Sequence, residues 1–207
     1  MYAIMVKDTN TILGYVQKMT IYTGRSLAGK FLVSMPKLDD ESFHHSVIYL
    51  CSHGKEGAMG FMINKKLKDF SFSDLAVPLP VNQFSNIENI YLYQGGPIEK
   101  IRGFVLHSAE YNKPGTYQID EHVAVSSNLD ILKDIAYGAG PVENLVALGY
   151  SAWEPMQLES EILNNDWLIV DSSNEILFHT EDDLKWEKAV AYSGIDLNRL
   201  IFNTGHA

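Results

Sequence analysis

The segment GYSAW at 149–153 places Ser151 between an apolar run and a helix-like segment. Hydrolases hold a nucleophilic serine on such a strand-to-helix turn, with an acid and a histidine later in the chain. The turn normally needs a second glycine after the serine, and Trp153 stands there instead. The alternative is a glycine at a strand end followed by an aromatic packing anchor. A hydrolase that uses Ser151 is therefore the second hypothesis, and its possible triad partners are Asp171, His179 and His206.

Histidines gather around the only cysteine of the chain. His44 and His45 precede a predicted strand that carries Cys51, and His53 follows two residues later. Residues two apart on a strand share a face, so Cys51 and His53 could supply two zinc ligands. Zinc takes three or four, and no matched pair follows at ligand spacing. We therefore expect a buried thiol near a loop histidine and no bound metal.

Two glycine-containing segments resemble phosphate-binding loops only because their residues are small. They are GGP at 95–97, which contains Gly95 and Gly96, and GAGP at 138–141. Neither has the spacing of a P-loop or of a dinucleotide fingerprint. Each ends in proline, which removes an amide donor that a phosphate would need. We interpret both groups as turns and expect no nucleotide cofactor.

Polar side chains near predicted strand ends give less specific evidence for a binding site than a complete motif would. Arg102 and His107 bracket a short strand and could hold an anionic group. The acid excess makes pairing of Arg102 with a surface carboxylate the favoured alternative. Trp153 lies close to Gln157 and Glu159 near a helix start. An exposed tryptophan would mark a partner site and a buried one would belong to the core, and the sequence leaves both open.

Length and composition indicate one domain without a nucleic-acid partner. The chain has 207 residues, with 16 Lys and Arg against 26 Asp and Glu, for a formal charge of −10. Duplex binding depends on phosphates neutralised by Lys and Arg, so this charge disfavours direct contact with nucleic acid. The densest cationic group, Lys65, Lys66 and Lys68, is followed at once by Asp69.

The same composition predicts a cytoplasmic protein. A single cysteine excludes an internal disulfide, and no apolar stretch approaches the ~20 residues needed to span a membrane. Residues 1–20 are interrupted by charged and polar side chains and lack the apolar segment of a secretion signal. Residues 1–26 read as an N-terminal extension, either an added edge strand or a disordered arm, before a domain at 27–207.

Periodicity predicts an α+β fold: a single domain with a mixed β-sheet core and a few flanking helices. Runs rich in β-branched and aromatic residues predict strands, and the second and third runs predict a hairpin. A helix is expected after a Ser127 cap, with Leu129, Leu132, Ile135 and Ala136 on one apolar face. Two more helices are expected, one after Pro155 with Leu158 and Ile162 facing inward and one from Thr180 to Gly194. The predicted strands span 31–35, 47–51, 58–64, 90–93, 103–107, 122–125, 145–149, 167–170 and 175–179.

Several short sequence segments, taken together and in order, resemble those of the bacterial YqgE/AlgH family. The resemblance runs from about residue 27 to the end of the chain. It rests on SLAGKFLV (26–33), MP (35–36), SVIYLCSH (46–53), GAMG (57–60), IN (63–64), GGP (95–97), RGFVLH (102–107), SSNLDIL (126–132), GAGP (138–141), LGYSAW (148–153), QLESEI (157–162), GID (194–196) and GHA (205–207).

The resemblance implies a cytoplasmic α+β protein without accepted catalytic residues. Some members are described as transcriptional regulators, a role that the acidic charge makes indirect here, through a protein partner. The family commonly has alanine or another small residue at the place of Ser151. It often has an arginine-proline pair where this chain has Lys65 and Lys66, which puts a shared role for that loop in doubt.

The leading hypothesis is a non-catalytic binding or regulatory protein that works through a protein or small-molecule partner. Its motivation is the absence of any complete catalytic or cofactor motif beside many glycine-bearing turns. Oligomeric state and partner identity are not fixed by the sequence. The candidate binding surface comprises Asn64, Gly95, Gly96, Arg102, His107, Ser127, Trp153, Gln157 and Glu159.

Overall fold

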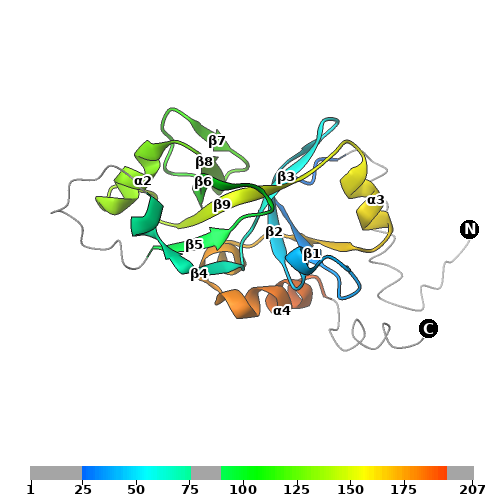
Figure 1. Ribbon diagram of the computed structural model, residues 1–207. Helices are drawn as coiled ribbons and strands as arrows, with labels where there is room; N and C mark the ends of the chain where they lie inside the picture. The colour runs from blue at the N-terminus through cyan, green and yellow to red at the C-terminus, as the bar shows by residue number, and fades with distance from the viewer. Residues whose placement is uncertain (1–24, 76–89, 195–207) are drawn as a thin grey trace, which may run out of the picture.

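A computed structural model describes residues 25–75 and 90–194 of the chain. A curled β-sheet forms its centre, and helices lie against the outside of the curl (Figure 1). The predicted extension at 1–26 falls almost wholly outside the described residues, so both interpretations of it stay predictions. Ser26 is described, and its hydroxyl donates to the carbonyl of His53 at 3.0 Å.

The sheet is mixed, as predicted. Its strands run in the order β10-β1-β2-β3-β9-β6-β8-β7, and β4 joins through β5, which pairs with β9. The β5–β9 pair is parallel and the other pairs are antiparallel. The strands are β1 (Lys30–Ser34), β2 (Val47–Gly54), β3 (Gly57–Met62), β4 (Lys66–Ser71), β5 (Tyr91–Gln94), β6 (Ile98–Ser108), β7 (Thr116–Gln118), β8 (Val123–Ser126), β9 (Asn144–Trp153) and β10 (Trp167–Asp171).

Strand β9 connects the two halves of the curl. Its first part pairs with β5 and β6, and its end, at Ser151 and Trp153, pairs with β3. Gly149 lies between these parts with φ +72°, a left-handed conformation that favours glycine. The predicted hairpin of β2 and β3 is confirmed, with a bulge between Leu50 and Ser52.

Within residues 25–75 and 90–194, three α-helices flank the sheet: α2 (Leu129–Ala136), α3 (Gln157–Leu163) and α4 (Asp182–Tyr192). Shorter helical turns are η1 (Glu41–Phe43), η2 (Phe72–Leu75) and the π-helical η4 (Glu175–His179). The strand predicted at 175–179 is therefore wrong. The amide and hydroxyl of Thr180 both donate to the carbonyl of Glu175, which closes a turn rather than extending a strand.

Helix starts differ from prediction in detail. Asn128, not Ser127, caps α2, because its side chain accepts from the amide of Ile131 at 3.2 Å. Leu129, expected on the buried face, is 53% exposed. In α3, Leu158 and Ile162 are buried as predicted. No helix within the described ranges is long and apolar enough to cross a membrane.

Each helix covers a separate part of the core. Ile131, Leu132 and Ala136 of α2 pack with Leu92 and Val146 of the sheet. Helix α3 packs with β1, β2 and β3 around Trp153 and Trp167. Helix α4 contributes Trp186, Ala189 and Val190 to the cluster that contains Phe31, Tyr49 and Phe61. Burial of these apolar side chains fixes α4 against the sheet and leaves its charged first turn beside β4.

Candidate functional site

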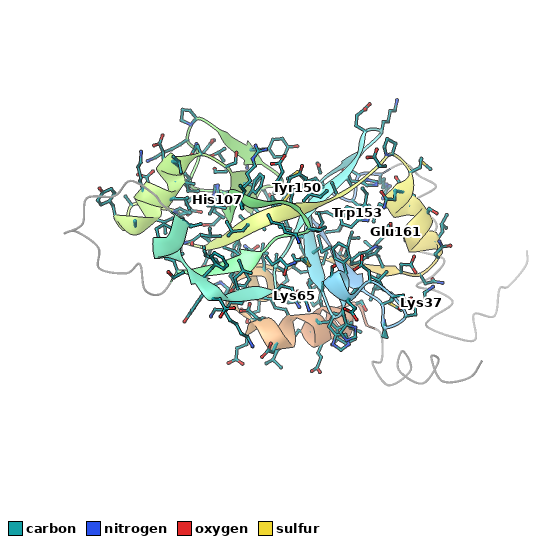
Figure 2. The ribbon with its side chains drawn as sticks, viewed as in Figure 1. Lys37, Lys65, His107, Tyr150, Trp153 and Glu161 are labelled. Atoms are coloured by element: carbon teal, nitrogen blue, oxygen red, sulfur yellow. The ribbon has the colours of Figure 1, made fainter. Side chains whose placement is uncertain are left out.

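A pocket of about 750 Å³ lies between α4 and the segment from Asn64 to Lys68. We name it the α4 pocket. Three groups of side chains line it: lysines of the β3–β4 connection and β4, acidic residues of α4, and the rings of His44, His45 and Trp186. Figure 2 shows Lys65 just above α4, at the junction of these groups.

The turn that carries His44 and His45 is held by the residues at the end of β3. Asn64 accepts from the amide of Val47 at 2.9 Å and donates from Nδ2 to the carbonyl of His45 at 2.8 Å. The ammonium of Lys65 donates to the carbonyl of His44 at 2.6 Å. His45 has φ +49°, a left-handed conformation that costs a non-glycine residue about 1 kcal/mol or more. The bonds to the two carbonyls hold this strained turn in place.

Three aromatic rings form a stack in the pocket wall. The centroids of His44 and His45 lie 4.2 Å apart, and those of His45 and Trp186 lie 4.4 Å apart. Trp186 is buried and donates from Nε1 to the carbonyl of Ser34 at 2.9 Å. Burial, then the nearby His44 and Lys65, lower the pKa of His45. The middle ring of the stack is therefore neutral near pH 7.

Beneath the pocket lies a buried lysine. Lys185 is 2% exposed, donates to the carbonyl of Ile63 at 2.8 Å and pairs with Asp182 at 3.1 Å. Burial lowers the pKa of Lys185, and Asp182 acts against that shift. Tyr93 also donates to Asp182, at 3.2 Å. Asp182 is thus held by two partners and acts as a structural group.

Other charged side chains that line the pocket are not used in ion pairs within the described residues. Within the described part of the chain, Lys68, Asp183 and Glu187 have no ion-pair partner within 4.0 Å. Burial lowers the pKa of Lys65, and the charge of Asp183 opposes this effect. The pocket therefore has a cationic wall on β4 and an anionic wall on α4, both open to a ligand.

Of the predicted surface residues, all of which the structure describes, Asn64 alone lines this pocket. Trp153, Gln157 and Glu159 gather at α3 instead. His107 of β6 lies at the other end of the sheet, toward α2 (Figure 2). The predicted surface is thus divided among separate places rather than joined into one.

Trp153 belongs to the core, which decides between its two interpretations. It is 6% exposed and donates from Nε1 to Glu161 at 2.8 Å. Trp167 donates to the same oxygen at 2.8 Å, and Gln157 donates to the other carboxylate oxygen at 2.9 Å. The Glu161 carboxylate therefore ties α3 to β9 and β10.

Glu159 faces His53, which lies near the end of β2 and not in the predicted loop. The amide of Leu27 donates to Nδ1 of His53 at 3.2 Å, so the proton of the neutral ring lies on Nε2, which is 3.1 Å from Glu159. Cys51 packs in a different cluster, with Phe31 and Tyr49, because the bulge in β2 turns the following residues over. The expected shared face of Cys51 and His53 is therefore wrong.

Gly95 and Gly96 allow two strands to approach closely. The amide of Gly95 donates to Leu148 at 2.8 Å, and a Cβ on Gly96 would lie 2.1 Å from the carbonyl carbon of Tyr150. Gly96 also borders a second, mainly apolar pocket of about 530 Å³ beside Phe70 and Ile101. Gly95 and Gly96 therefore permit close packing of the backbone.

Arg102 and His107 do not converge. Arg102 is exposed and donates to Glu99 at 3.0 Å, the alternative that the acid excess favours. His107 is fully buried; its Nδ1 donates to the carbonyl of Ser108, and its Nε2 accepts from Ser126 at 3.0 Å. Burial lowers the pKa of His107. Ser127 is exposed beside this cluster and takes no part in it.

Among the residues that the structure describes, no hydrolase arrangement is assembled around Ser151. The serine is 1% exposed, lies within β9, and donates to the carbonyl of Gly95 at 3.4 Å. Asp171 pairs with Lys30, and His179 with Glu143 at 3.3 Å. His206, the third possible partner, lies outside the described residues.

Comparison with known proteins places the chain in a family. Residues 31–198 match the family described as DUF179: AlgH-like. The chain belongs to the AlgH-like family. This AlgH-like protein is 40% identical over 188 residues to a UPF0301 protein of Brucella abortus, covering 87% of this chain and 94% of the relative. It is 42% identical over 182 residues to one of Marinomonas sp., covering 87% and 96%.

Solved structures agree with this assignment. The solution structure of the AlgH protein from Pseudomonas aeruginosa has a TM-score of 0.72 and 35% identity to the AlgH-like protein, over 87% of this chain and 96% of that one. A protein from Corynebacterium diphtheriae shares the fold at a TM-score of 0.65 and 18% identity, over 84% and 90% of the two chains. These comparisons confirm the AlgH family that the short sequence segments predicted.

Proposed function

We propose that this AlgH-like protein is a non-catalytic binding protein and that the α4 pocket holds its ligand. The observation that carries the proposal is the pair of oppositely charged walls, Lys68 on one side and Asp183 with Glu187 on the other, which lack ion-pair partners among the described residues. Charges left facing a cavity favour a ligand that neutralises both walls.

The ligand carries both a cationic and an anionic group. The carboxylates of α4 repel a purely anionic ligand, and the lysines of β4 repel a purely cationic ligand. A segment of a partner protein, or a small molecule with both charges, satisfies both walls. A regulatory role then acts through the bound partner, because the acidic wall and the net charge of −10 oppose contact with phosphates.

Reversing each wall tests the proposal. The probe is the peptide acetyl-Gly-Arg-Gly-Asp-Gly-amide, with acidic-only and basic-only peptides beside it, in calorimetric titrations at low salt. We expect the doubly charged peptide to bind most tightly. Lys68→Glu and Asp183→Lys should each weaken it about fivefold, because each replaces an attraction by a repulsion.

Matched controls carry the same charge changes elsewhere. Lys133→Glu and Asp130→Lys alter an exposed pair on α2, away from the pocket. These variants should leave binding unchanged. Equal weakening by pocket and control variants, or no binding by any peptide, would contradict the α4 pocket as the site.

A further inference from the structure

We infer that the cationic group of the ligand is an arginine side chain of a protein partner, stacked on the exposed ring of His44. This inference rests on the proposed function of the α4 pocket and names the chemistry of its ligand. Two features carry it: the order of the ring stack and the position of the carboxylates around it.

The ring stack has one closed end and one open end. Trp186 closes it, since this ring is buried against β1 and donates to Ser34. His45 lies between, with interplanar angles of 20° to Trp186 and 15° to His44. His44 is exposed, and among the described residues no further ring stacks on it. The outer face of His44 can therefore continue the stack with a planar group from a partner.

The stack is held rigidly enough to act as a preformed surface. Lys65 fixes the carbonyl of His44, and Asn64 fixes the carbonyl of His45. The left-handed backbone at His45 turns its ring onto Trp186. A planar ligand group therefore meets a surface that needs little ordering on binding.

Charge selects a planar cation over other planar groups. The acidic side chains of α4 line the same pocket as the stack. Glu187 acts to raise the pKa of His45, against the larger effects of burial, His44 and Lys65, which lower it, and the ammonium of Lys65 is bound to the carbonyl of His44. A guanidinium stacks on aromatic faces and pairs with carboxylates through a planar fork. A lysine ammonium pairs but does not stack, and a nucleobase stacks but brings phosphates toward Asp183. Arginine is the protein side chain that satisfies both features.

The test compares three pentapeptides that differ at one side chain. The Arg peptide defined above is compared with versions that carry Lys or citrulline, by calorimetry at about pH 8, where free imidazoles are neutral. Lysine keeps the charge without the plane, and citrulline keeps the plane without the charge. We expect the Arg peptide to bind about fivefold more tightly than either.

Variants of His44 locate the effect. His44→Ala should remove the preference for Arg over Lys, and His44→Phe should restore it because a ring returns. His122→Ala, a change at an exposed histidine elsewhere, is the control. Equal affinities for the Arg and Lys peptides, or a preference that survives His44→Ala, overturn the inference and leave the α4 pocket as a charge-based site. Failure of all three peptides to bind overturns both proposals.

Discussion

The side-chain amide of Asn64 donates to the carbonyl of His45 at 2.8 Å, while its oxygen accepts from the amide of Val47 at 2.9 Å. One side chain thus spans the left-handed turn that carries the stacked histidines. The position was predicted as part of a binding surface; in the structure Asn64 shapes the wall of the α4 pocket rather than presenting a free polar group.

Asn64→Ala removes both hydrogen bonds and should lower the free energy of unfolding by about 2 kcal/mol, since each bond contributes about 1 kcal/mol. Urea denaturation followed by tryptophan fluorescence measures the change. Asn64→Asp keeps the acceptor for Val47 but loses the donor to His45, so it should also be destabilised. Stability within about 0.5 kcal/mol of the parent for Asn64→Ala would show that the turn does not depend on this residue.

Glu161→Gln should lower the free energy of unfolding by about 2 kcal/mol or more. The carboxylate accepts from Trp153, Trp167 and Gln157, and an amide group replaces one acceptor oxygen by a donor. Thermal and urea denaturation measure the loss. Glu121→Gln, at a side chain 85% exposed, is the control and should change little. If both variants behaved alike, the carboxylate would not tie α3 to the sheet.

Gly96→Ala should destabilise the protein by at least about 3 kcal/mol, because the new methyl group would lie 2.1 Å from the carbonyl carbon of Tyr150. Gly103→Ala provides the contrast: the nearest atom to its Cβ, on Leu148, is 3.9 Å away. That variant should be unchanged or about 0.5 kcal/mol more stable. Expression and urea denaturation of the pair give the answer. Equal tolerance at both positions would contradict close packing at Gly96.

Acidification should weaken the fold through His107. Burial lowers its pKa from 6.5, so below that pH the unfolded chain binds a proton that the folded chain excludes. Its stabilising contribution is complete above pH 6.5 and is lost as pH falls toward the folded-state pKa, with a slope of at most about 1.4 kcal/mol per pH unit. Glu110 lies near this ring, and its pKa is lowered from 4.5. Its contribution to the pH dependence of stability therefore falls in a more acidic range than that of His107.

Unfolding free energies between pH 7.5 and about pH 5 measure this effect. His107→Asn should have a shallower pH dependence than the parent. The pKa of His45 is also lowered, so part of the slope should remain in the variant. Identical slopes for the parent and His107→Asn would show that His107 does not contribute to the pH dependence of stability.

Local patterns predicted much of the fold. The runs around the loop at 53–57 predicted the hairpin of β2 and β3, because β-branched residues and glycines specify both strands and turn. The spacing of Leu158 and Ile162 predicted the buried face of α3. β4 was missed because it is an exposed edge strand in which Lys66 and Lys68 replace apolar residues.

The site was harder to predict, because its parts meet only through tertiary packing. His44 and His45 were noted only beside Cys51 and His53, which were weighed as zinc ligands. Nothing in the sequence around the two histidines indicates that Trp186 stacks on His45. The lysines at 65, 66 and 68 were considered only as a possible contact for nucleic acid, and the acidic residues of α4 were not considered as part of a site. Glycines such as Gly96 were predicted to border a surface, but a sequence does not distinguish a turn open to solvent from one pressed against a neighbouring strand.

We place the ligand of this protein in the α4 pocket. Amide chemical shifts of the isotope-labelled full chain, followed during titration with acetyl-Gly-Arg-Gly-Asp-Gly-amide, test it most directly. We expect the largest shifts on His44, His45, Lys68 and Asp183. In Asp183→Lys, about fivefold more peptide should be needed to reach half of the full shift at His44, His45 and Lys68. Shifts centred on α3 or on the apolar pocket beside Ile101, or no shifts at all, would contradict it.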